Sequence, residues 1–280
     1  MSSRFRFRGT AFGVAGSFTY PFQELIEVQA SSSLPDIGGY GSSRVCNFQH
    51  RDILRFDLAH TEVIGTTHDP DTDKTTYSTR AQSTIEGFNL MDMVTADRIV
   101  ANITSSYDPN GAGEPRVKLI GSRFENLKIA GIPIKVELAV DTFDKYPTYQ
   151  LLAEKYEAKD DDGQHVRDLF DDITLKKRYN EAPPKVARWF NPPRQDNTKM
   201  PEHKGVTSVS LIKKLTPMDA GAGLDCFGHV IHVSGFGTIR LAEVGISSAT
   251  RAVTMLQVNL GSPAGGRVSG GGADDGGTTW

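Results

Sequence analysis

The sequence predicts a mainly β protein, an antiparallel β-sandwich or jelly-roll-like fold with a short α-helical and irregular insertion. Three observations support this fold class. Residues with high strand propensity recur in short alternating runs. Turn-forming residues separate these runs, and the chain contains 28 Gly and 14 Pro. Helical spacing is confined to one internal segment. At 280 residues, the chain is long enough to bury a substantial core.

The N-terminal half contains most of the predicted strands. Phe5 and Phe7 alternate with Arg4, Arg6 and Arg8, which is typical of an amphipathic strand with an exposed edge. The next predicted strands share β-branched or alternating residues and cover 10–20, 23–30, 51–64 (one or two strands), 75–85, 85–90, 94–105, 116–119, 122–129 and 132–140. Turn residues predict loops at 31–43, 68–74 and 107–113, and a tight turn at 130–131.

The pattern changes at residue 141. Segments 148–159 and 164–177 have helical spacing, and a proline-rich stretch follows them. We therefore expect 1–140 to be the first part of a β-domain, 141–204 a helical and Pro-rich insertion or arm, and 205–262 the second part. Strands are predicted again at 206–215, 230–233, 238–247 and 251–260. Residues 263–280 are rich in glycine and predict a C-terminal tail.

The last of these strands alternates over its whole length. We expect one face to carry Thr254, Leu256, Val258 and Leu260, and the other to carry Val253, Met255 and Gln257. Earlier in the chain, Gly13 and Gly16 within a predicted strand indicate a bulge or a close backbone approach.

Charge and hydropathy exclude several classes of protein. The 31 Lys and Arg residues against 34 Asp and Glu give a formal net charge of −3, which argues against a nucleic-acid binder. No apolar run is long enough for a transmembrane segment. The basic N-terminus is not followed by the apolar region of a signal peptide, which predicts a cytoplasmic location.

No sequence motif identifies a catalytic, cofactor-binding or metal-binding residue. Asp69, Asp71 and Asp73 resemble the start of a calcium loop, but the expected glycine and closing glutamate are missing, so a solvated hairpin tip is the favoured interpretation. His229 and His232 are three residues apart, which places their rings on opposite faces of a strand and disfavours a shared metal. Whether Cys46 and Cys226 form a disulfide stays open.

Two segments resemble a known family. Ser83–Asp97 (STIEGFNLMDMVTAD) and Gly121–Ile134 (GSRFENLKIAGIPI) are similar to the choice-of-anchor P family of bacterial surface proteins. The resemblance covers about 50 residues and excludes 141–204. It implies a β-rich protein at the cell surface or outside the cell, with no known set of catalytic residues. This location is the alternative to the cytoplasm.

The sequence favours a non-enzymatic structural subunit that assembles with copies of itself into a filament, shell or surface layer. The exposed first strand, the arm and the tail would exchange contacts between neighbours. The predicted assembly contacts are Phe5, Phe7, Trp189, Phe190 and Trp280.

Two alternatives belong to other functional classes. A glycan-binding or other ligand-binding module would stack sugars on exposed aromatic residues such as Tyr40, Tyr107 and Trp189. A hydrolase would need a cleft that joins His229 or His232 to a carboxylate.

Overall fold

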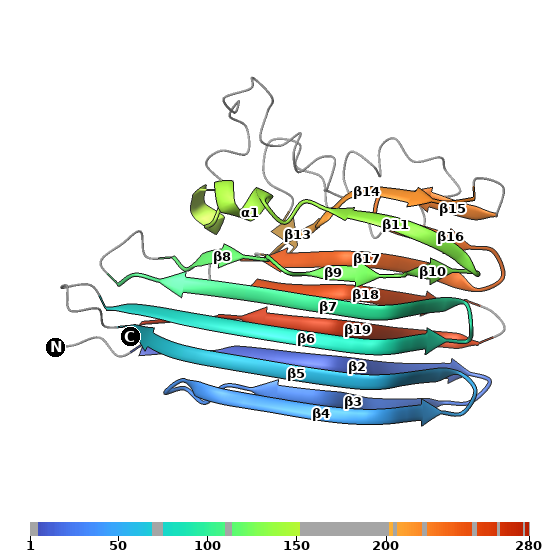
Figure 1. The fold of residues 1–280 in the computed structure, drawn as a ribbon, viewed down its shortest axis with the longest axis horizontal. Helices are drawn as coiled ribbons and strands as arrows, with labels where there is room; N and C mark the ends of the chain where they lie inside the picture. The colour runs from blue at the N-terminus through green and yellow to red at the C-terminus, as the bar shows by residue number, and fades with distance from the viewer. Residues whose placement is uncertain are drawn as a thin grey trace, which may run out of the picture.

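Two large antiparallel sheets pack face to face and form a β-sandwich (Figure 1). The computed structural model describes residues 5–68, 75–109, 114–151, 202–203, 206–219, 223–247, 251–261, 264–276 and 278–279. Within these residues the predicted fold class, a mainly β protein with two packed sheets, is confirmed. The hydrophobic core fills the space between the sheets and includes Phe56, Phe88 and Leu256.

Strands that follow one another in the chain mostly lie in the same sheet. The first sheet, called the front sheet here, has the strand order β14 (Ile212–Pro217), β11 (Ile132–Leu138), β10 (Lys128–Ile129), β7 (Val94–Tyr107), β6 (Thr76–Leu90), β5 (Leu54–His68) and β4 (Gly39–His50), with β8 (Arg116–Lys118) and β9 (Arg123–Glu125) paired to β7. The second, the back sheet, has the order β12 (Glu202–His203), β13 (Val206–Ser210), β17 (Gly237–Ile246), β18 (Arg251–Leu260), β19 (Gly265–Asp275), β2 (Gly9–Tyr20) and β3 (Glu24–Ser33), with β16 (Val230–Val233) paired to β17 and β15 (Leu224–Phe227) to β16. A small third sheet joins β1 (Phe5–Arg6) to β20 (Thr278–Thr279).

Most predicted strands coincide with observed ones, and the differences have local causes. The tight turn at Ala130 and Gly131 is a two-residue hairpin in which both residues have positive φ. The predicted loop at 31–43 is wrong, because its serines and glycines continue β3 to Ser33 and start β4 at Gly39. In the described part of the insertion there is one short helix, α1 (Thr142–Lys145), and a second helical turn that begins at Tyr149.

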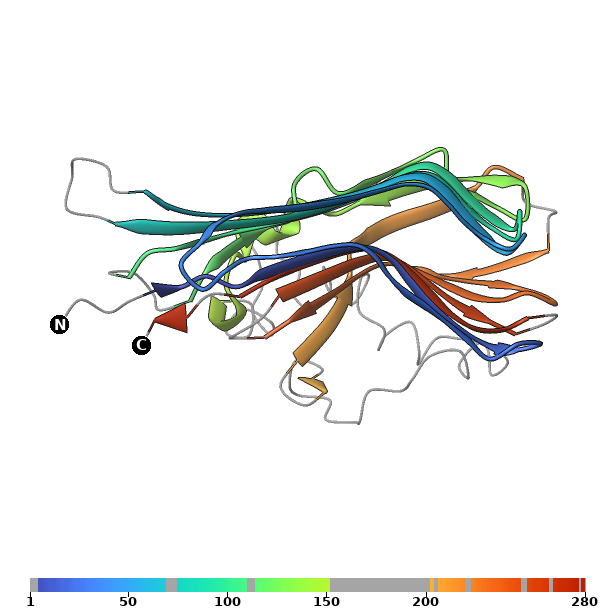
Figure 2. The same cartoon turned by 90° about the horizontal axis from the view of Figure 1, so that it is seen from below.

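Both sheets bend sharply at the same level of the sandwich (Figure 2). In the front sheet the bend follows a row of aligned residues on successive strands, Asn47, Asp57, Gly87, Asp97 and Asn126, of which Asn47, Gly87 and Asn126 have positive φ. In the back sheet the corresponding row is Ala30, Gly13, Gly271, Met255 and Ala242, of which Ala30, Gly271 and Ala242 have positive φ. A left-handed residue on every second strand interrupts the pleat and turns the sheet.

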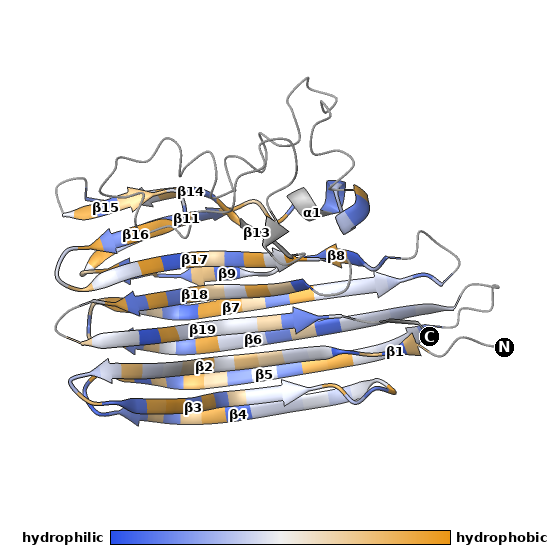
Figure 3. Cartoon of the chain, turned by 180° about the vertical axis from the view of Figure 1, so that it is seen from behind, coloured by the Kyte–Doolittle hydropathy of each residue, from blue (hydrophilic) through white to orange (hydrophobic). Residues whose placement is uncertain are grey.

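The bend also shifts the inward and outward alternation by one residue. In β18 the buried side chains are Val253 and Met255 before the bend, and Leu256 and Val258 after it. The predicted division of this strand into two continuous faces is therefore wrong at its centre. Figure 3 shows the resulting short blocks of hydrophobic and hydrophilic residues along the strands.

The glycine-rich segment predicted as a C-terminal tail is a central strand. β19 lies between β18 and β2 in the back sheet. Its glycines permit close packing on both sides: a Cβ at Gly270 would lie 3.3 Å from Ile85 of the front sheet, and a Cβ at Gly272 would overlap the ring of Phe12 on the outer face. Glycine is thus used here for close approach of neighbouring groups.

The chain crosses between the sheets at both edges of the sandwich. At one edge β3 leads into β4 through residues 34–38. At the other, Leu211 lies between β13 and β14, and its backbone bonds to Ala139 near the front sheet and to Ala242 in the back sheet. No helix among the described residues has the length and apolar composition that a membrane crossing requires.

Candidate functional site

The N-terminal aromatic residues pack within their own chain. The ring of Phe5 stacks on Tyr77 at 4.4 Å and on Tyr107 at 5.2 Å between ring centroids, and Phe7 contacts both Phe5 and Tyr77 edge-on. Phe7 is only 4% exposed. The backbone of Phe5 pairs with Thr279. These contacts place both rings against aromatic residues of the same chain and leave Phe5 half-buried, and the role of Phe5 and Phe7 as contacts between subunits stays a prediction.

Several other predicted residues lie outside the described part of the chain. These are Trp189, Phe190 and Trp280 among the assembly contacts, and Asp69, Asp71 and Asp73 of the calcium alternative. The described residues contain no cluster of three or more metal-ligating side chains. Cys46 and Cys226 are free and exposed, so they do not form the disulfide that the sequence left open.

The two histidines have different partners, since His229 lies in the turn before β16 and contacts Glu243, whereas His232 lies on β16 and contacts Thr238. His229 is 1% exposed, and its Nε2 lies 3.3 Å from Oε1 of Glu243. Burial raises the pKa of Glu243, but the hydrogen bond and charge of His229 and the charges of Arg240 and Arg267 together bring it below its usual value. Neither histidine lines either of the two described pockets. This pair joins the turn between β15 and β16 to β17 of the back sheet.

One edge of the front sheet is open over its full length. In the described part of the chain, β4 pairs with β5 alone, and no residue of β4 is buried. Its pairing is regular from Gly39 to Cys46, so the backbone groups on its free side form an uninterrupted edge. β3, the edge strand of the back sheet, lies directly behind it: a Cβ on Gly41 would lie 2.9 Å from the carbonyl oxygen of Ser33.

The opposite edge of the same sheet has a different composition. β14 carries Lys213 and Lys214, both exposed, and ends at Pro217. Lysine and proline on an edge strand prevent the pairing of further strands. The sequence of β4, GYGSSRVCNFQH, contains neither residue and no acidic side chain. Only the β4 edge thus lacks these protective residues, within the described part of the front sheet.

Apolar side chains are exposed next to this edge. They lie at the end of β2 and along β3, and they are Tyr20 (64% exposed), Phe22 (52%), Leu25 (76%) and Val28 (51%). The guanidinium of Arg51 lies 4.3 Å from the centre of the Phe22 ring. Scattered exposed apolar residues are common, but a group of this kind beside an open edge indicates a contact surface.

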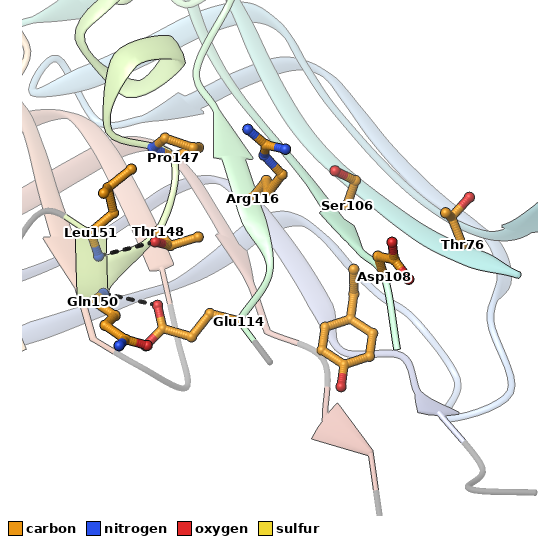
Figure 4. Close-up of a pocket in the computed structure, with 10 residues that line it drawn as sticks. Thr76, Ser106, Asp108, Glu114, Arg116, Pro147, Thr148, Gln150 and Leu151 are labelled. Carbon is orange, nitrogen blue, oxygen red and sulfur yellow. Dashed lines mark hydrogen bonds between the residues drawn. The ribbon is translucent and has the colours of Figure 1, made fainter. Parts of the chain in front are cut away.

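A pocket lies at the end of the sandwich that holds the chain termini. Its volume is about 420 Å³, and it is bounded by β6, β7 and β8 on one side and by Pro147–Leu151 on the other (Figure 4). Glu114 points toward the start of the second helical turn, where its Oε2 accepts a hydrogen bond from the backbone N–H of Gln150 at 3.1 Å. Asp108 and Arg116 add one charge of each sign to the wall.

A buried ionic cluster lies behind this pocket. The guanidinium of Arg251, 1% exposed, is 3.7 Å from Oε2 of Glu114, and Asp275 is its directly paired neighbour on β19. Burial raises the pKa of Asp275 to about 7, although the Ser105 hydroxyl and the charge of Arg251 oppose the shift. Burial likewise lowers the pKa of Arg251. Glu114 therefore links the pocket wall and the front sheet to the back sheet.

The fold and these surfaces define a bent antiparallel β-sandwich protein in which the described residues form an open edge on the front sheet and a pocket beside the chain termini. Residues 5–247 match the family described as a domain of unknown function, DUF8256, and the chain belongs to this family. A comparison with curated proteins and one with solved structures find no match.

Sequence reasoning named one residue of each surface, Tyr40 on β4 and Tyr107 in the pocket wall, where Tyr107 is buried and not exposed as predicted, and it missed the other residues that define them. Glu114 and Arg251 are 137 positions apart and come together only through the pairing of the sheets. The open edge had a weak signal in the absence of lysine, proline and acidic residues from 39–50, but edge positions are not assigned until the strand order is known.

Proposed function

We propose that this protein is a non-enzymatic structural subunit that associates with copies of itself through the β4 edge. The observation that carries the proposal is the contrast between the two ends of the front sheet, lysine and proline on β14 and a regular strand without them on β4. An edge of this kind adds a strand from a partner, and a second copy supplies an identical one. The proposed contact thus lies at β4, whereas Phe5 and Phe7 pack against aromatic residues of their own chain.

A larger assembly needs a second contact besides the β4 edge. A two-fold pairing of identical edges closes a dimer, whereas a filament, shell or surface layer requires a further interface. The exposed residues Tyr20, Phe22, Leu25 and Val28 provide an apolar surface for it. The proposal therefore expects dimers at low concentration and larger particles as the concentration rises.

Light scattering with negative-stain electron microscopy on the purified chain tests this function. The wild type is expected at twice the 30.5 kDa chain mass or above. Ser42→Lys, which places like charges side by side in a β4 pair, should return the protein to the monomer mass. Thr66→Lys, on the exposed face of the interior strand β5, is the matched control and should leave association unchanged. A wild type that stays monomeric at all concentrations contradicts the proposal.

The pocket supports a second candidate, a ligand-binding module. Its wall combines Pro147 and Leu151 with Glu114, Asp108 and Arg116, so it offers hydrogen-bond acceptors and donors beside apolar surface. A neutral polyhydroxylated molecule such as a sugar suits this balance. Saturation-transfer NMR with a panel of mono- and disaccharides tests this candidate, with Glu114→Ala as the variant that should lose the signal.

A further inference from the structure

We infer that two copies pair through β4 in one particular register, with Ser42 on the two-fold axis and Tyr40 of each copy against Arg44 of the other. The inference rests on the proposed function and specifies its interface. It follows from which β4 side chains face outward, which register uses the regular segment and which charges would meet.

The outward face of β4 contains four exposed side chains in its regular part, those of Tyr40, Ser42, Arg44 and Cys46. Gly41, Ser43 and Val45 between them are half-buried toward the other sheet. Tyr40 is 62% exposed. Arg44 carries the only full charge of the strand. The outer face of β4 therefore offers an aromatic ring and a guanidinium two positions on either side of Ser42.

Symmetry restricts the registers that β4 can adopt with its copy. Opposed residues of an antiparallel pair lie on the same face of the sheet, so the two-fold axis passes between two copies of the same residue. The regular segment runs from Gly39 to Cys46, and most of it, seven of its eight residues, is paired only when the axis lies at its middle, at Ser42 or Ser43. An axis at Arg44 would oppose two guanidinium groups directly.

The axis at Ser42 is the better of the two remaining registers. It places Arg44 opposite Tyr40 twice, and opposed side chains on one face have Cβ atoms about 4.5–5.5 Å apart. This separation lets a guanidinium stack on a tyrosine ring within about 6 Å of its centre. An axis at Ser43 places Arg44 opposite Ser42 and Tyr40 opposite Cys46, which leaves both groups without this contact.

Cysteine cross-linking tests the register on the full-length protein. In a Cys46→Ser, Cys226→Ser background, Ser42→Cys should form an intermolecular disulfide rapidly, since directly paired Cα atoms lie about 4.5–5.5 Å apart, within disulfide reach. Ser43→Cys should cross-link slowly. Gln49→Cys, exposed on the same strand beyond the regular segment, is the matched control and should not cross-link.

A distance measurement on the natural cysteine gives an independent readout. With Cys226→Ser, a nitroxide on Cys46 of each copy should give a backbone separation of about 27 Å for the Ser42 axis and about 20 Å for the Ser43 axis, from the rise of about 3.4 Å per residue. Arg44→Gln should weaken the dimer about fivefold to thirtyfold through the loss of two stacking contacts.

The outcomes separate this inference from the proposed function. Rapid cross-linking of Ser42→Cys, the longer label distance and a weaker Arg44→Gln dimer support the register. A dimer that cross-links through Ser43→Cys, or that shows the shorter distance, overturns the register and leaves assembly through β4 intact. A monomeric wild type overturns both.

Discussion

Gly272 on β19 and Phe12 on β2 provide a sharp test of the role of glycine in this fold. The two residues are direct partners, and a Cβ at position 272 would lie 1.9 Å from Cε1 and 2.3 Å from Cζ of the Phe12 ring. Carbon atoms in contact are normally about 3.5–4.0 Å apart, so Gly272→Ala must displace the ring from the sheet. The half-buried ring covers on the order of 100 Å² of apolar surface.

The expected free-energy changes follow from this area. If the ring loses between somewhat more than half and nearly all of this apolar contact, the cost is ~1.5–2.5 kcal/mol at about 25 cal/mol per Å². Alanine in a strand gains ~0.5–1 kcal/mol over glycine, so Gly272→Ala should destabilise by about 1 kcal/mol. In a Phe12→Ala background the same substitution should stabilise by about 0.5–1 kcal/mol, because nothing is displaced.

Urea unfolding of the four proteins of this double-mutant cycle measures the coupling, expected at about 1.5–2 kcal/mol. The sign of the Gly272→Ala effect should reverse between the two backgrounds. If Gly272→Ala has the same effect with and without the Phe12 ring, the glycine is not present for ring packing, and the reasoning is refuted.

Three further substitutions test other parts of the structure. Asp275→Asn should be more stable than the wild type at pH 8 by about 1–3 kcal/mol. The pKa of Asp275 is about 7 in the folded state against an ordinary 3.8, so its contribution to the stability of the wild type is complete below pH 3.8 and is lost as the pH rises through 7. Denaturant unfolding from pH 4 to 8 measures this loss. Gly237→Ala should cost at least 3 kcal/mol in a thermal-melt comparison, since its φ is +148° and its Cβ would lie 2.1 Å from the carbonyl oxygen of Asn259. Gly235→Ala, with a φ of +75° and open space around the Cβ, should cost only about 1 kcal/mol. Phe5→Ala should lower the free energy of unfolding by about 1–2 kcal/mol and leave association unchanged; lost association with unchanged stability would instead support the predicted intermolecular role of Phe5.

Local sequence patterns predicted the fold class and most strands because each strand alternates over several residues. β16 and β18 were predicted with their observed bounds. The patterns failed where tertiary packing sets the residue type. Gly270 faces Ile85 of the other sheet, a contact that no local pattern contains. A strand built to admit neighbouring side chains has the composition of a linker, so residues 263–280 were predicted as a tail.

The bend explains a second failure. In β18 apolar and polar residues alternate on both sides of Met255, so the sequence gives no sign that the inward-facing positions shift by one residue there. The shift becomes visible only in the row of aligned back-sheet residues that ends at Ala242. The corresponding row in the front sheet is easier to recognise from the sequence, because Asn and Gly adopt positive φ readily. In this row Asn126 also donates a hydrogen bond from Nδ2 to Oδ2 of Asp97 at 2.6 Å. Gly87, Asp97 and Asn126 lie in the two motif segments that the sequence analysis singled out, 83–97 and 121–134, so these segments include residues that shape the bend.

The same bend bears on assembly. It interrupts β4 at Asn47, so the strand's regular edge ends at Cys46 and provides eight residues for pairing. A short edge limits how many hydrogen bonds a partner strand can make and confines the register to the middle of the segment. An unbent β4 of twelve residues would permit several registers of similar energy. The row of left-handed residues that curves the sandwich thus also makes the proposed interface specific, and replacing Asn47 by a β-branched residue should broaden the set of cross-linked registers.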